Sequence, residues 1–174
     1  PEDVYPSILI LQSVNVDRSG VMITTGIASG DPADVTIAFS RGVGGAVDGQ
    51  AAESWLMTPS EVRLLSPARE PTYRSLPTSG GTSVVPTSYE ERLLGPAELS
   101  ILRELASDVK ARLPDMPGMH SQGPWDVELG FQTGKLWLFQ VRPFVENRSA
   151  ESTTYLQNLD VQPKQPRRRT PNSR

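Results

Sequence analysis

The sequence predicts an α+β fold built mainly from an antiparallel sheet with one long helix. Short segments in which apolar and polar residues alternate recur along the chain, which is typical of half-buried strands. Only one segment carries an apolar stripe at helical spacing. The 174 residues include 14 glycines and 16 prolines, which favours turns between short strands over a helical bundle. A chain of this length normally makes one domain around one core.

Apolar runs and alternating segments predict five strands in the first part of the chain. The clearest pattern is in residues 34–40, where Val35, Ile37 and Phe39 share one face. The apolar run 7–14 suits a strand that is buried on both faces. The expected strands are residues 7–14, 20–25, 34–40, 52–57 and 62–65.

A long loop and a helix are expected next. Residues 67–88 are rich in proline, serine, threonine and glycine, which predicts a loop without regular structure. Gly95 and Pro96 open the helix 97–113, because proline suits the first helical turn. Proline 114 ends this helix. Its apolar stripe consists of Ile101, Leu102, Leu105, Val109 and Leu113.

Residues 125–143 predict a β-hairpin with its polar groups on one face. A three-residue loop, 133–135, in which Gly134 takes a positive φ, keeps the two faces separate, whereas a two-residue loop would mix them. The apolar pairs of this register are Phe131 with Trp137, Leu129 with Phe139, and Val127 with Val141. The polar pairs are Glu128 with Gln140 and Asp126 with Arg142.

The polar face of this hairpin has two interpretations. A carboxylate beside an amide oxygen, as in Glu128 and Gln140, suits a hard cation such as Mg²⁺. Arg142 can hold phosphate oxygens in a planar fork. The alternative is an ordinary polar strand face on which Asp126 and Arg142 form a cross-strand ion pair. The pattern alone leaves both open.

The same residues resemble the end of the nucleotide-binding domain of the phosphoenolpyruvate synthase and pyruvate phosphate dikinase family. That family closes its ATP-grasp domain with a D-x-E strand, a turn and a Q-x-R-P strand, which stand here at 126–128 and 140–143. The resemblance implies that Glu128 and Gln140 help to hold Mg²⁺ at the phosphates of ATP, with Asp126 close by. It also implies that Arg142 contacts the transferring phosphoryl group.

The resemblance extends upstream to two further segments. Gln12-Ser13-Val14, followed by Ser19-Gly20-Val21, is similar to the family's Q-x-M-V and S-G-V segments. It implies an adenine hinge at Gln12, Ser13 and Val14, although a plain core strand is the alternative. Residues 41–49 resemble the family's G-L-G-E-x-V-x-G stretch but carry Gly45 where glutamate is common. A structural turn explains this loop as well as a ligand loop does.

Several classes of function are not supported by the composition. The chain has no cysteine, so disulfides and thiolate chemistry are excluded, and its one histidine, His120, is expected to be an exposed loop residue. A net charge of −3 predicts no nucleic-acid partner. We expect no membrane segment and, without a visible signal peptide, a cytoplasmic protein. Residues 148–174 predict a disordered tail, in which the basic run 167–169 is solvated.

The resemblance covers residues 6–145 and only the later part of the family's domain, which predicts a C-terminal portion of an ATP-grasp-like domain at 1–147. It implies a phosphotransferase that passes phosphate from ATP to a histidine carrier or a small acceptor such as pyruvate. The earlier subdomain, with its lysine and arginine, and the phosphohistidine domain would come from the same chain or from a partner. We therefore expect a fragment that is inactive alone. The alternative is a non-catalytic module that binds nucleotide or packs against a partner.

Overall fold

The computed structural model describes residues 8, 10–46, 51–89 and 91–146. The chain divides into two compact units, Pro1–Phe144 and Val145–Arg174. Of the second unit, only residues 145 and 146 are described. The expected tail, 148–174, therefore lies outside the described residues, and the domain boundary near residue 147 remains a prediction.

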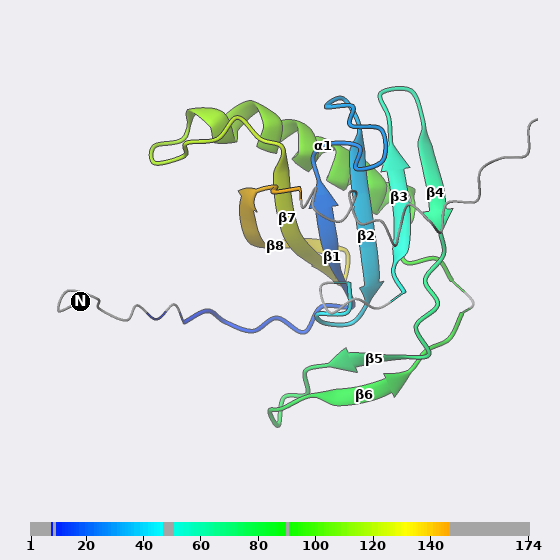
Figure 1. Cartoon of the computed structure of the whole chain (residues 1–174). Helices are drawn as coiled ribbons and strands as arrows, with labels where there is room; N and C mark the ends of the chain where they lie inside the picture. Colours follow the sequence, from blue (N-terminus) through cyan, green and yellow to red (C-terminus); the bar gives the residue numbers. More distant parts are fainter. Residues whose placement is uncertain (1–7, 9, 47–50, 90, 147–174) are drawn as a thin grey trace, which may run out of the picture. The chain divides into compact units, whose positions relative to one another are not determined.

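The first unit contains a six-stranded sheet whose neighbouring strands are all antiparallel (Figure 1). The strand order is β4-β3-β2-β1-β7-β8, so the first four strands form a meander and the later hairpin joins it at β1. With one α-helix among the described residues, this confirms the expected α+β class. The strands are β1 Arg18–Ile23, β2 Val35–Arg41, β3 Glu53–Met57, β4 Val62–Ser66, β7 Trp125–Gln132 and β8 Lys135–Pro143.

The helix α1, Pro96–Arg112, lies across one face of the sheet and continues into a short 3₁₀ turn, Leu113–Asp115. The backbone N–H of Gly95 donates to the carboxylate of Glu98 at 3.0 Å, which satisfies one of the unpaired donors at the start of the helix. The buried side of the helix consists of Leu102, Ala106 and Val109. The predicted helix is thus confirmed, shifted by one residue.

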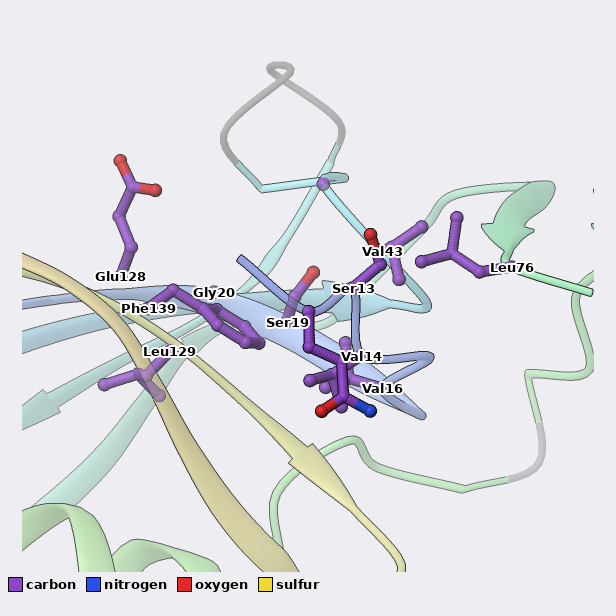
Figure 2. Close-up of a pocket in the computed structure, with 12 residues that line it drawn as sticks. Ser13, Val14, Val16, Ser19, Gly20, Val43, Leu76, Glu128, Leu129 and Phe139 are labelled. Atoms are coloured by element: carbon purple, nitrogen blue, oxygen red, sulfur yellow. The ribbon is translucent and has the colours of Figure 1, made fainter. Parts of the chain in front are cut away.

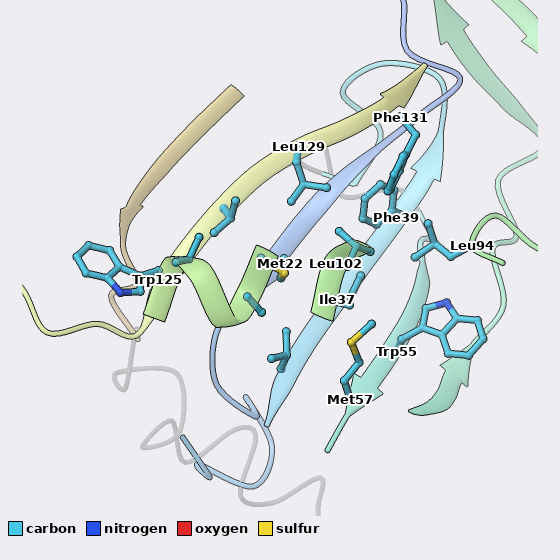
Figure 3. Packing of buried hydrophobic residues seen from close by; sticks show 14 of the residues in the cluster. Met22, Ile37, Phe39, Trp55, Met57, Leu94, Leu102, Trp125, Leu129 and Phe131 are labelled. Atoms are coloured by element: carbon cyan, nitrogen blue, oxygen red, sulfur yellow. The ribbon is translucent and has the colours of Figure 1, made fainter. Parts of the chain in front are cut away.

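A single hydrophobic core fills the space between α1 and the sheet (Figure 3). Val127, Leu129 and Phe131 of β7 are fully buried there, as are Ile37 and Phe39 of β2. The alternating face predicted for residues 34–40 is therefore the core face.

In the described chain, no helix is both long enough and apolar enough to cross a membrane.

The segment 67–88 is not the unstructured loop that its composition predicted. It contains a second, two-stranded antiparallel sheet, made of β5 Thr72–Ser75 and β6 Ser83–Pro86. All side chains of both strands are exposed or half-buried. The hairpin is held by backbone pairing and not by an apolar face, so alternation gave no signal for it.

The prediction of a strand over residues 7–14 is also wrong for the residues described, 8 and 10–14. None of them belongs to a strand, and Ile8, Ile10 and Leu11 are 85%, 88% and 67% exposed. The sheet offers no place beside β1, because β2 and β7 already pair with its two edges. β1 itself begins at Arg18, two residues before the strand expected there.

Candidate functional site

The hairpin β7–β8 closes with a two-residue turn, Thr133-Gly134, and not with the expected three-residue loop. Both residues have positive φ, 51° and 76°, as in the type I′ turns that suit the twist of paired strands. The carboxylate of Asp17 accepts a hydrogen bond from the Thr133 backbone N–H at 2.6 Å, which helps to hold this unusual φ for threonine.

The shorter turn changes the register near the tip and leaves it unchanged at the polar end. Leu129 pairs with Leu138 and Phe131 with Leu136, so the predicted apolar pairs near the turn are wrong. A register shift beside Glu128 then inserts one extra residue, Phe139, into β8. Beyond this β-bulge, three predicted pairs are confirmed: Val127 with Val141, Glu128 with Gln140, and Asp126 with Arg142.

Glu128 and Gln140 lie opposite each other on the sheet face that α1 does not cover. Their neighbours Val127 and Leu129 point into the core, so alternation directs Glu128 the other way. The Cβ atoms of such a cross-strand pair are about 4.5–5.5 Å apart. A carboxylate and an amide oxygen are thereby presented side by side, with Glu128 half-buried and Gln140 exposed.

Asp126 and Arg142 form an ion pair on the same face. Nε and Nη2 of Arg142 lie 2.9 and 2.8 Å from Oδ2 of Asp126. This hydrogen bond, reinforced by the charge of Asp126, raises the pKa of Arg142. Oδ1 of Asp126 is buried and has no hydrogen-bond partner among the described residues. One carboxylate oxygen thus orients the arginine, and the other is a buried acceptor without a partner among the described residues.

A pocket of about 240 Å³ lies between the N-terminal segment, the glycine-rich loop after β2 and the β7–β8 hairpin (Figure 2). Gln12, Ser13 and Val14 line it together with Glu128. Asp126, Gln140 and Arg142 do not line it but continue along the same sheet face from Glu128. The structure therefore brings together segments that lie far apart in the sequence. The remaining lining residues are Val16, Ser19, Gly20, Val43, Gly44, Leu76, Leu129 and Phe139.

The glycine-rich loop is fastened to β5 where it borders the pocket. Gly42 has a φ of 67°, and a Cβ atom there would lie 2.0 Å from the carbonyl oxygen of Arg74. The neighbouring Val43 N–H donates to that same oxygen at 2.9 Å. Glycine at this position is required both by its conformation and by the close approach of β5. The end of the loop, 47–49, lies outside the described residues.

The sequence pattern did not predict two of the residues that line the pocket. Leu76 follows β5 in a segment predicted to be a loop, and its N–H donates to Oδ1 of Asn15 at 2.8 Å. Phe139 was expected on the apolar face of the hairpin, and the β-bulge moves it to the pocket. His120 is exposed, in the loop before β7, as expected.

The donor set on this face fits a magnesium ion that keeps several water ligands. Across the described ranges, no group of three or more His, Cys, Asp or Glu side chains is arranged to hold a metal. Mg²⁺, however, is usually bound through one or two carboxylates together with water and substrate phosphates. Glu128 and the amide oxygen of Gln140 are donors of that kind, whereas the unpaired Oδ1 of Asp126 is buried beside them.

Comparison with known families assigns the chain to a nucleotide-binding class of domain. A family model described as "Pyruvate phosphate dikinase, AMP/ATP-binding domain" matches residues 1–162, so the chain belongs to this family. The family consists of kinase-type enzymes, and the matched part is their ATP-binding domain. Among curated proteins, none matches the chain at a significant level.

Proposed function

We propose that this chain is the C-terminal portion of an ATP-grasp-like domain and binds Mg-ATP in an ATP-dependent phosphotransferase. The observation that carries the proposal is the pocket that joins residues 12–14 to Glu128, with Gln140 and Arg142 beyond it on the same sheet face. The family match supports ATP as the ligand. The direction of the nucleotide follows, with its base at residues 12–14 and its phosphates toward Arg142.

The base end combines apolar side chains with the polar segment 12–14. Backbone groups of Gln12, Ser13 and Val14 would hydrogen-bond the base edge, since within the described part of the chain this segment makes few backbone hydrogen bonds. The side chains of Val14 and Val43 add apolar surface beside it. A mostly apolar wall with a few polar groups is the usual chemistry of a ligand pocket.

The phosphate end is polar and has cationic and anionic groups. Glu128, Gln140 and Asp126 would hold Mg²⁺, which when bound neutralises phosphate charge and orients the transferring group. Arg142 uses Nε and Nη2 toward Asp126, which leaves the two hydrogens of Nη1 for a phosphate oxygen. Its side chain is 57% exposed and can reach a ligand on this face.

The pocket accounts for part of an ATP site. Its volume of about 240 Å³ is below the roughly 300–1,000 Å³ of complete ligand sites. Phosphoryl transfer also requires positive groups around the phosphates. We propose that an earlier ATP-grasp subdomain contributes a lysine and an arginine, and that a phosphohistidine domain or a small molecule such as pyruvate accepts the phosphate. Whether these come from the same chain or a partner, the present chain binds nucleotide without turnover.

A non-catalytic nucleotide-binding module is the second candidate, and one observation favours it. Gly45 stands where the family's loop commonly has glutamate, so any role of that carboxylate is missing at this position. In that case the chain still binds nucleotide, and a complete parent protein does not transfer phosphate.

Calorimetric titration with Mg-ATP tests the proposal. The chain, or its parent, is expected to lose most of its affinity when Glu128→Ala and Arg142→Ala are combined. A matched control is Glu61→Ala with Arg63→Ala, an exposed acid just before β4 and an exposed base within it, at the other edge of the sheet. If the wild type does not bind, or if the first double variant binds as tightly as the wild type, the proposed site is wrong.

A further inference from the structure

The β-bulge at Phe139 places two adjacent residues on the same face of the sheet. In a regular strand, neighbouring side chains point to opposite faces, so a residue next to Gln140 would point toward the core. Here Gln140 pairs with Glu128 and Leu138 with Leu129, and Phe139 is the extra residue between the two pairs. Bulges commonly redirect a side chain in this way beside a binding site.

The position of the Phe139 ring can be fixed from the glycine beneath it. Gly130 lies two residues from Glu128, so its Cβ direction is toward the face that α1 leaves uncovered. A Cβ atom at Gly130 would lie 3.1 Å from Cε2 of Phe139 and 2.9 Å from Cγ1 of Val16. The ring therefore rests over Gly130, beside Val16, and a glycine is what permits this close approach.

The ring also forms one boundary of the pocket. Phe139 is 42% exposed, which is high for a phenylalanine in a paired strand. Figure 2 shows the ring pointing from β8 toward Ser19, with Val14 on the far side. The pocket thus has an aromatic ring at one side and aliphatic side chains, Val14 and Val43, at another. Such a space suits a flat, aromatic ligand group.

We propose that Phe139 is the residue on which the nucleotide base stacks, and that the β-bulge couples this stacking position to the magnesium ligand Gln140, its neighbour in the chain. This inference rests on the proposed function. It adds a base-binding residue that the family-like motif does not contain. A stack recognises the face of the ring and not its edge, so Phe139 strengthens the binding of any nucleoside triphosphate. Discrimination between bases falls to the backbone near residues 12–14.

Three ligands separate a stacking role from a structural one. Mg-ATP and Mg-GTP both carry a base, whereas magnesium tripolyphosphate carries only the phosphate chain. Phe139→Ala is expected to weaken ATP and GTP binding by a similar factor, at least about fivefold, and to leave tripolyphosphate binding unchanged. Phe139→Trp should retain ATP binding, and ATP should quench the fluorescence of the new indole.

Leu138→Ala is the matched control, because Leu138 is the adjacent exposed residue and does not line the pocket. It should bind all three ligands as the wild type does. If Phe139→Ala does not fold, Phe139→Leu replaces it, since leucine keeps the apolar volume without a ring. The inference is overturned if the folded variant loses all three ligands equally, or loses none of them. If the wild-type protein does not bind Mg-ATP, the proposed function is overturned together with the inference. If the wild type binds Mg-ATP and only the result for Phe139→Ala differs from the expected one, the inference alone fails.

Discussion

Replacement of Glu53 should be among the most destabilising changes in this domain. Its side chain is 1% exposed on the core side of β3 and accepts three hydrogen bonds. The donors are Nε1 of Trp55 at 2.9 Å and the backbone N–H groups of Leu93 and Leu94, both at 3.0 Å. One carboxylate therefore ties the segment leading into α1 to the sheet.

The expected loss of stability follows from the hydrogen-bond donors that a substitution at Glu53 leaves without an acceptor. Glu53→Ala leaves three buried N–H groups without an acceptor, and each unsatisfied group costs about 1–3 kcal/mol. Water that enters the vacated space recovers part of this, so we expect a loss of about 3–5 kcal/mol. Glu53→Gln keeps the volume and one carbonyl oxygen. That oxygen can serve the two donors now on Oε1, leaving Leu93 unpaired at a cost of about 1–3 kcal/mol.

Urea unfolding followed by tryptophan fluorescence measures these losses as changes in the free energy of unfolding. The expected order of destabilisation is Glu53→Ala, then Glu53→Gln, then the exposed control Glu61→Ala, which should change little. The total free energy of unfolding of a typical domain is about 5–15 kcal/mol, so Glu53→Ala would remove a large share of it. A loss below about 1 kcal/mol for Glu53→Ala would refute the assignment of this carboxylate as a structural acceptor.

Three further changes have defined outcomes. Gly42→Ala should destabilise the fold by at least about 1 kcal/mol more than Gly30→Ala, measured by urea unfolding. Both glycines have positive φ, but an added Cβ meets backbone only at Gly42 and open space at Gly30. Burial lowers the pKa of Lys110, so the folded state disfavours the charged form of this side chain. The free energy of unfolding of the wild type, relative to Lys110→Met, should therefore increase as the pH rises from that lowered pKa to 10.5. Thermal unfolding at several pH values measures this difference. Asp126→Asn should weaken Mg-ATP binding in calorimetry, because it removes the charge that orients Arg142. An unchanged affinity would contradict the proposed position of the phosphates beside Arg142.

The sequence predicted the elements whose side chains alternate between core and solvent. Residues 34–40 and the helix were found because burial of Ile37, Phe39 and Leu102 imposes a visible period. The hairpin 72–86 was missed because backbone pairing holds it, and backbone groups leave no mark in a sequence. The run 7–14 was misassigned because its composition suits a strand while the sheet has no free position beside β1.

The candidate site was predictable to a similar degree. Placing Asp126 and Glu128 away from the core fixed the polar end of the hairpin, so their pairing with Arg142 and Gln140 could be derived. The turn and the bulge could not be derived from the sequence. A two-residue turn combined with one extra residue in β8 gives the same strand pairs beyond the bulge as a three-residue loop without a bulge. The wrong turn length and the missed bulge therefore cancel, and the predicted pairs of residues 126–128 are correct. The roles assigned to these side chains remain predictions.

The attachment of β5 to the glycine-rich loop has a consequence for how this domain can diverge. The contact between the Val43 N–H and the Arg74 carbonyl oxygen uses groups that every residue other than proline possesses. Substitutions along the hairpin can therefore accumulate while this side of the pocket stays attached, provided that residue 42 remains glycine. Homologues should accordingly preserve the hairpin's position while its residues become unrecognisable, so an alignment would mark the region as variable although it shapes the pocket.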